Sequence, residues 1–263
     1  MGLKTKAFIT VIIAYYKNRQ ALSLILESLS NQSNTSFEVI IAEDDTPSDV
    51  SDIVTKYSFD IQHAYQAVDQ GFRKNMMLNK SLKLAKGNYI VFLDGDCIVH
   101  PQFIAAYYRH MAPKTILFGR RVMLSEQMTK VLYDSQDIKQ IHWFNLLKMR
   151  CKRWKYNIYL PWISQPRSHG IWGHNWGVWL SDLQAVNGFD EDYQEAGVGE
   201  DVDIEWRLIA NGCNLVSIRF AAIQYHLHHR ENYDEETIKR GKAKLAEKQN
   251  AGFIVCKNGL QKK

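Results

Sequence analysis

The chain has 263 residues, of which 46% are hydrophobic and 23% charged, enough for a large core in one domain or in one domain with an extension. No run of about 18 apolar residues occurs, so no membrane span is expected, and the net charge of +5 is modest. The four cysteines are far apart and form no CxxC pair, which argues against a disulfide framework or a zinc ribbon and favours reduced thiols in the cytosol.

The first half of the sequence alternates between strand and helix patterns. Residues 8–13 ("FITVII") form an apolar, β-branched run typical of a strand covered on both faces, not a signal peptide, because no small-residue cleavage site follows. Further strands are predicted at 37–42, 59–65 and 89–93, and helices at 20–31, 48–57 with Ser48 as the N-cap, and 72–86 ending at Gly87. This alternation predicts βαβ units and a mostly parallel sheet.

The second half is less regular. Residues 125–155 are predicted to be mainly helical, 177–180 extended, and 181–188 a short helix. An amphipathic helix follows at 201–211, then short strands at 215–220 and 222–225, and a charged helix at 234–250.

Two acids, Asp94 and Asp96, directly follow the buried strand at 89–93. Ligands of open α/β sheets sit at the carboxyl ends of the strands, where these acids are expected. The chain has no GxGxxG or GxxxxGK[ST] motif to cradle a phosphate, so a divalent cation on Asp96 would bridge to a diphosphate. The alternative is an exposed turn with two solvated acids.

Two further acidic segments support a site at this edge. The strand at 37–42 leads into "AEDDTPSD", and "GVGEDVDIEWRLIANG" places Glu200 and Asp201 at the start of a helix. Acids at a helix N-terminus also act as simple partners of the helix dipole, which accounts for Asp203 and for Glu200 but not for the glycine-rich approach through Gly197 and Gly199.

Taken together, these segments resemble the GT-A glycosyltransferases of the inverting family 2 type. The resemblance rests on "ITVIIAYYKNRQALSLILESLSNQ", "FEVIIAEDDT", "GNYIVFLDGD", and "GHNWGVWLSDLQAVNGFDEDY" followed by "GEDVDIEWRL", and it covers about residues 8–229. The last pair also looks like the C-terminal region of β-1,4-galactosyltransferases. The resemblance implies a GT-A catalytic domain at 1–230, with a nucleotide-sugar half at about 8–123 and an acceptor-binding and catalytic half at about 124–230. A helical extension would follow at 231–263.

The resemblance also implies roles for single residues. Asp96 would contact Mn²⁺ or Mg²⁺ directly, Asp94 would contact the ribose and the metal shell, and Asp201 would be the general base. Asp44 would bind the uracil ring, with Glu43 and Asp45 as its neighbours. The remaining donor contacts would come from Ala14 and Tyr15, which line the nucleotide, and from Arg73 or Lys74 near its phosphates.

The histidine-rich segment "IQYHLHHRENY" has three interpretations: a zinc site, a solvated surface run, or a ligand to the sugar-nucleotide metal. In relatives with this layout a histidine at this point is the third metal ligand. His226 is our first choice, and His228, on the same side of an extended chain, is the alternative.

The segment "SHGIWGHNWGVWLS" is the expected acceptor wall. The resemblance assigns Asn175 to it, with Glu200 nearby, and Trp172 and Trp176 would stack on a sugar face. The alternative places Trp179 and Trp176 in the core.

The implied function is transfer of a hexose or N-acetylhexosamine from a UDP-sugar to a glycan hydroxyl, with inversion, in bacterial surface polysaccharide or lipopolysaccharide synthesis. The "GEDVDIEWRL" region mildly favours UDP-galactose or UDP-N-acetylgalactosamine, and UDP-glucose and UDP-N-acetylglucosamine stay open. A nucleotidyltransferase would need a glycine-rich, basic first loop, which is absent. A sugar-nucleotide-binding protein without transfer activity is the other alternative, and the acidic strand ends argue against nucleic acid as a partner.

A final feature is the basic and aromatic stretch "KQIHWFNLLKMRCKRWKYNIYLPW" at 139–162. Residues 138–181 contain no acid, but they hold seven lysines and arginines and six of the seven tryptophans. Lys, Arg and interfacial Trp favour anionic membrane surfaces. We therefore expect a cytoplasmic enzyme with peripheral contact on the inner face of the cell membrane, beside a lipid-linked acceptor. The alternative is an ordinary helix whose aromatics pack on the sheet.

Overall fold

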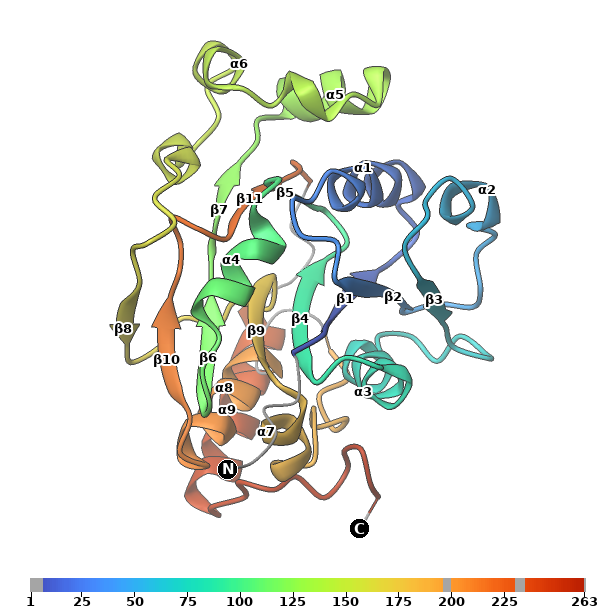
Figure 1. Cartoon of the computed structure of the whole chain (residues 1–263). Coiled ribbons are helices and arrows are strands. Elements are labelled where there is room, and N and C mark those ends of the chain that lie inside the picture. Colours follow the sequence, from blue (N-terminus) through green and yellow to red (C-terminus); the bar gives the residue numbers. More distant parts are fainter. Residues whose placement is uncertain (1–6, 196–199, 230–234, 263) are drawn as a thin grey trace.

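The computed structural model describes residues 7–195, 200–229 and 235–262. An eight-stranded sheet forms its centre, in the order β3-β2-β1-β4-β9-β6-β10-β8 (Figure 1). The strands are β1 (Ile9–Tyr15), β2 (Phe37–Glu43), β3 (Ile61–Ala64), β4 (Tyr89–Asp94), β6 (Thr115–Phe118), β8 (Gln165–Arg167), β9 (Asn175–Trp179) and β10 (Asn214–Ser217). Only β9 and β8 run against the others, so the predicted mostly parallel α/β sheet is confirmed.

Helices cover both faces of this sheet. On one face, alternate residues of β1 such as Val11 and Ile13 pack with α1 (Arg19–Ser30) and α4 (Phe103–His110). On the other face, Ile12 packs with α3 (Lys74–Leu84), α7 (Leu180–Ala185) and α8 (Glu200–Ala210). Burial on both faces explains the continuous apolar runs of β1, β2 and β4.

A second, three-stranded sheet extends the carboxyl edge of the first. It consists of β5 (Cys97–Val99), β11 (Ile223–His226) and β7 (Arg120–Met123), with β11 in the middle. A third hydrophobic cluster joins β7 and β11 to α5 (Glu126–Ser135) and to Leu146 of α6 (Trp143–Lys148). In Figure 1, α5 and α6 lie beyond α1 and β7, at the end toward which β4 points.

The predicted elements are found with shifted bounds, and two predictions are wrong in detail. Ser48 does not cap a helix, because α2 (Ser51–Val54) begins later and the Ser48 N–H donates instead to Glu43 Oε2 at 2.9 Å. The helical stretch at 125–155 is broken into α5, η1 (Ile138–Gln140), α6 and η2 (Trp154–Asn157). Strands β5, β6, β7 and β8 and helix α4 were not predicted.

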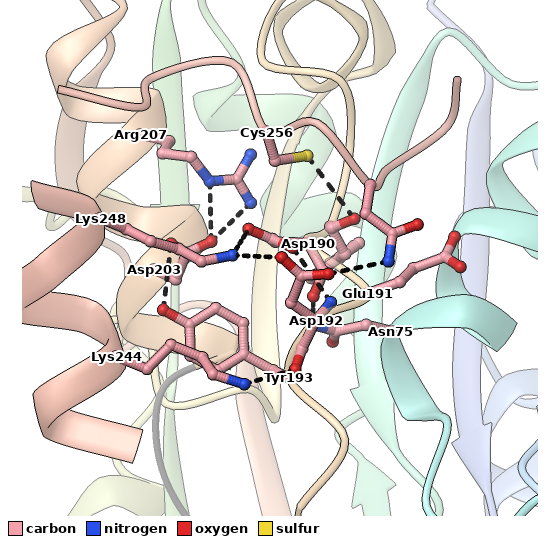
Figure 2. Close-up of polar contacts among 12 residues, drawn as sticks. Asn75, Asp190, Glu191, Asp192, Tyr193, Asp203, Arg207, Lys244, Lys248 and Cys256 are labelled. Atoms are coloured by element: carbon pink, nitrogen blue, oxygen red, sulfur yellow. Dashed lines mark hydrogen bonds and ion pairs between the residues drawn. The ribbon is translucent and has the colours of Figure 1, made fainter. Parts of the chain in front are cut away.

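The C-terminal segment packs back onto the loop that follows α7. Helix α9 (Glu235–Asn250) places Lys248 between Asp190 and Asp192, and Figure 2 shows its ammonium group directed at both carboxylates. The Asn187 side chain donates to the carbonyl groups of Cys256 and Gln261, both at 2.8 Å. The C-terminal segment is therefore held against this loop by polar contacts.

Helix α8 contacts the same loop through Arg207, whose side chain also forms a buried ion pair within the helix. Arg207 contacts Asp203 at 2.7 Å, and both side chains are 1% exposed. The Arg207 Nη1 also donates to the carbonyls of Val186 at 2.9 Å and Gly188 at 2.7 Å.

Within the described ranges, no helix has the length and hydrophobicity needed to cross a bilayer.

We expect Arg207→Met to lower the free energy of unfolding by about 3 kcal/mol or more, because the Asp203 carboxylate would stay buried without its ion-pair partner. Urea unfolding measures this. The matched control is Lys130→Met, which removes the exposed pair with Asp134 and should change stability little. Equal effects of the two substitutions would contradict the structural role given to Arg207.

Candidate active site

The two acids of the "DGD" segment lie where the large sheet passes into the small one. Asp94 is the last residue of β4 and lies opposite Ala14 of β1. The Gly95 N–H donates to the Ala14 carbonyl at 2.8 Å, and a Cβ at Gly95 would lie 2.6 Å from that oxygen. Only glycine fits this contact, which holds the two acids beside the end of β1.

Asp96 forms a cluster with two histidines. Strand β11 pairs with β5 so that His226 lies opposite Cys97, and the Leu227 N–H donates to the Asp96 carbonyl at 2.9 Å. The Asp96 Oδ2 lies 3.3 Å from His226 Nε2 and 3.0 Å from His229 Nε2. The two imidazole nitrogens are 3.2 Å apart.

This cluster has the composition of a metal site. One ligand atom from each of Asp96, His226 and His229 lies within 4.8 Å of the other two. Burial acts to raise the pKa of Asp96, but hydrogen bonds from both histidines, and a weaker contribution from Cys97, hold that pKa well below its usual range. A charged carboxylate facing two imidazole nitrogens suits a divalent cation such as Mn²⁺.

The structure brings together His226, as predicted, and His229, which the sequence analysis passed over. The alternative, His228, lines the same pocket but is not a member of this cluster of Asp96, His226 and His229, and its backbone N–H donates to Thr129 Oγ1 at 2.8 Å. The prediction assumed an extended chain after His226, but β11 ends at that residue. Asp94 does not join this cluster. Its Oδ1 lies 3.3 Å from Lys74 Nζ.

A pocket of about 750 Å³ opens along this edge. It contains most of the predicted donor residues together with Asp201 and the cluster of Asp96, His226 and His229, called the metal cluster below. Its lining includes Ala14, Tyr15, Tyr16, Asp44, Lys74, Asp94, Asp96, Arg121, Tyr133, Trp172, Gly173, Asp201, His226, His228 and His229.

Of the three acids at the end of β2, Glu43, Asp44 and Asp45, Asp44 is the one that lines the pocket. The Asp44 carboxylate accepts from the Arg73 N–H at 2.9 Å and from Gln66 Nε2 at 2.8 Å. Burial raises the pKa of Asp44, and these hydrogen bonds oppose the shift. Glu43 is instead buried, with its Oε2 2.7 Å from His63 Nε2. Asp45 pairs with Lys17, which is not part of the pocket lining.

Lys74 provides the positively charged side chain next to Asp94 in the pocket. Arg73 contributes its backbone N–H to Asp44, and its guanidinium donates to the Phe72 carbonyl at 2.8 Å. Lys74 was the other choice from the sequence, and it lines the pocket.

Asp201 lies in the first turn of α8 and lines the pocket. Its Oδ1 accepts from the Val202 N–H at 2.8 Å. Gly173 lies between the two halves of the site, since a Cβ there would be 3.5 Å from Lys74 Nζ and 4.0 Å from Asp201 Oδ2. Lys74, Gly173 and Asp201 therefore meet at one point of the pocket.

The predicted acceptor residues separate into two groups. Trp172 is 46% exposed and lines the pocket. Trp176 is 1% exposed and stacks on Phe92 with ring centroids 4.3 Å apart, so we no longer propose that it stacks on a sugar. Asn175 is also buried: its Oδ1 accepts from the Tyr107 hydroxyl at 2.6 Å, and its amide donates to Ala222. The Glu200 side chain lies outside the described part of the chain.

The sequence model of the family Glycosyl transferase family 2 matches residues 10–164, which is more than half of the chain. The chain belongs to glycosyltransferase family 2. This family 2 protein is 23% identical over 239 residues to the chondroitin synthase of Escherichia coli, with 83% of this chain and 34% of the synthase aligned. It thus spans about a third of the length of that relative.

Two solved structures show that the fold of this family 2 glycosyltransferase is GT-A. TarS 1-349 of S. aureus in complex with UDP has a TM-score of 0.59 and 17% identity, over 91% of this chain and 64% of that chain. GalNAc-T7 with UDP, GalNAc and Mn²⁺ has a TM-score of 0.65 and 11% identity, over 93% and 48%.

Mn²⁺ binding should distinguish the neighbouring histidines. His229→Ala and Asp96→Ala should each weaken Mn²⁺ binding by about tenfold or more, because each removes one ligand of the cluster. His228→Ala is the matched control and should bind Mn²⁺ like the unmodified chain. Calorimetric titration with Mn²⁺ measures all three, and loss of binding in His228→Ala alone would refute the assignment.

Proposed function

We propose that this family 2 enzyme transfers a hexose or N-acetylhexosamine from a UDP-sugar to a hydroxyl group of a glycan acceptor, with inversion at the anomeric carbon and with a divalent metal. The observation that carries the proposal is a single pocket that contains Asp44, the cluster of Asp96, His226 and His229, and Asp201. A base-recognising acid, a cation site and a second acid are the groups that this reaction requires.

Two observations support a UDP-sugar as donor. Asp44 presents a carboxylate at the end of β2, beside Ala14 and Tyr15 of β1, where the resemblance places the uracil contact. The structures of TarS and GalNAc-T7, which share this fold, are both solved with UDP. The donor sugar stays open between glucose, galactose and their N-acetylamino forms.

Asp96, His226 and His229 would hold the metal, and Mn²⁺ or Mg²⁺ is the proposed ion. Their composition and closeness support this, as does Mn²⁺ in the structure of GalNAc-T7. When bound, the ion neutralises charge on the leaving diphosphate. Lys74, paired with Asp94 and next to Gly173, adds a second positive charge on the donor side of the pocket.

Asp201 is the proposed general base. An acceptor hydroxyl that attacks the anomeric carbon must lose its proton, and a carboxylate within hydrogen-bonding reach accepts it. Asp201 Oδ1 accepts from the Val202 N–H, and its Oδ2 would lie 4.0 Å from a Cβ at Gly173, a residue of the same pocket lining. One displacement with one base inverts the configuration, by the geometric reasoning that also separates the glycosidase classes.

The acceptor is proposed to be a growing surface polysaccharide, either lipopolysaccharide or capsule. Similarity to a chondroitin synthase supports a polysaccharide product. Trp172 is the exposed aromatic side chain of the predicted acceptor wall and the one that we retain in the proposed acceptor site.

Asp201→Asn should reduce turnover by about 10²-fold or more and leave UDP affinity in the presence of Mn²⁺ near that of the unmodified chain. UDP release from UDP-glucose, UDP-galactose and their N-acetylamino forms measures turnover, with and without Mn²⁺. A parallel loss of UDP affinity would place Asp201 in the donor site, and metal-independent release would refute the proposed mechanism.

We also propose that α6 contacts anionic membrane. Trp143, Phe144 and Leu147 are 42%, 66% and 49% exposed, and Leu146 is the buried residue of this helix. The i, i+4 spacing of Trp143 and Leu147 fits either a face packed on the core or a face that contacts lipid, and their exposure favours contact with lipid. The exposed Lys148, Arg150 and Lys152 surround them. Each such charge contributes about 1 kcal/mol near anionic lipid.

Replacement of Lys148, Arg150 and Lys152 with Glu should abolish salt-sensitive co-sedimentation with phosphatidylglycerol vesicles, because charge reversal turns attraction into repulsion. Neutral phosphatidylcholine vesicles give the background. The matched control replaces the exposed Lys56, Lys83 and Lys257 with Glu, which changes net charge equally on other elements. Equal binding of both variants to the anionic vesicles would refute the role of α6.

A further inference from the structure

Two arginine side chains contact Trp172, a residue of the pocket lining, and a third arginine lies near the first of them. The Arg120 guanidinium lies over the Trp172 ring, 4.1 Å from its centroid, and the Arg153 guanidinium lies 5.8 Å from it. Arg219 is close enough for its charge to act on Arg120. Arg120, Arg153 and Arg219 are called the arginine cluster below.

The arginine cluster lacks an acidic partner among the residues that the structure describes. Arg120 Nη1 donates to the carbonyl groups of Gly119 at 3.1 Å and Gly170 at 2.8 Å. Arg153 and Arg219 form no ion pair with a described acid, and the Arg219 Nε is buried without a hydrogen bond there. Glu205 is the acid whose charge reaches Arg120, but its Oε2 already accepts from the Gly170 and Ile171 N–H groups.

This arrangement is unfavourable unless an anion completes it. Burial lowers the pKa of Arg120, and the charges of Arg153 and Arg219 lower it further, yet a guanidinium remains protonated. Three neighbouring cations repel one another, and a buried N–H without a partner loses its hydration. Stacking on Trp172 would need only Arg120, so a purely structural role leaves Arg153 and Arg219 unexplained.

The arginine cluster adjoins the pocket through Trp172, the residue retained in the proposed acceptor site, and its three members are not themselves among the lining residues. Trp172 lines the same pocket as Asp201 and is followed by Gly173, which lies next to Lys74 and Asp201. Arg121, the neighbour of Arg120 on β7, also lines the pocket, and its Nε is buried without a hydrogen bond among the described residues. The donor diphosphate is assigned to the other group of charges, the metal cluster and Lys74.

We propose that the arginine cluster binds an anionic oxygen group of the acceptor glycan, either a hexuronate carboxylate or a phosphodiester. This inference rests on the proposed function, since it names the acceptor class of that same site. The planar guanidinium group matches both anions, because its parallel N–H donors engage two oxygens at once. Trp172, which lines the pocket, contacts both Arg120 and Arg153, and it is 46% exposed.

Binding measurements on the full chain with UDP and Mn²⁺ present test this directly, because the donor diphosphate site is then filled. The probes are a hexuronate-containing tetrasaccharide, the same tetrasaccharide with its carboxyl groups reduced to alcohols, and a glycerol phosphate oligomer. Arg153→Gln removes one exposed charge of the arginine cluster, and Lys155→Gln, two residues later and also exposed, is the matched control. Arg219→Gln, with its melting temperature recorded, is the second test variant.

At least one anionic probe should bind about tenfold more tightly than the reduced tetrasaccharide. Arg153→Gln and Arg219→Gln should each reduce that preference several-fold, whereas Lys155→Gln should retain it. The probe that binds identifies the anion as carboxylate or phosphodiester. Equal binding of charged and reduced probes, or a preference that survives both arginine substitutions, overturns the proposal. If the unmodified chain does not bind UDP and Mn²⁺, the proposed function itself is refuted, so the two failures are distinguishable.

Discussion

The contact between Gly95 and the end of β1 is the constraint on which the site depends. The chain leaves the large sheet at Asp94 and enters the small sheet at Cys97, and Gly95 crosses between them against the Ala14 carbonyl. A side chain at Gly95 would push β4 away from β1, which would separate the two acids from the end of β1. Because the small sheet is centred on β11, the same crossing brings Asp96 next to His226.

A second constraint acts from the C-terminal side, through the loop after α7. Lys248 holds Asp190 and Asp192, while Asn75 of α3 donates to the Asp190 carbonyl at 2.7 Å (Figure 2). Arg207 ties α8 to the start of this loop. The helix that carries Asp201 is thereby fixed to α3, which carries Lys74, even though these elements are far apart in the sequence. This network of polar contacts keeps the two halves of the pocket at their spacing, and no disulfide contributes, because all four cysteines lie among the described residues and are free.

The sequence was informative where a signal is local and long. Strands β1, β2 and β4 are six or seven residues long and mostly apolar, and Asp94, Asp96 and Asp201 stand at or next to the ends of regular elements. Strands of three or four residues, such as β5 and β7, carry too few positions for a pattern to appear. The metal cluster depends on the pairing of β5 with β11, whose partners are far apart in the chain. No local pattern distinguishes His229 from His228, because the turn after β11 decides which of them meets Asp96.

The distribution of charge in the pocket follows from the substrates that it is proposed to hold. A UDP-sugar is an anion, and an anionic acceptor in the same pocket would be repelled by it unless each had its own positive partner. The metal cluster and Lys74 would neutralise the donor, and the arginine cluster would neutralise the acceptor. Asp201 is proposed to accept a proton between donor and acceptor, so the acceptor's anion needs a positive partner other than the groups that would hold the diphosphate. The lack of acids from 138 to 181 then has a physical reason. A carboxylate in that stretch would pair with Arg120 or Arg153 and occupy the place of the acceptor's own charge.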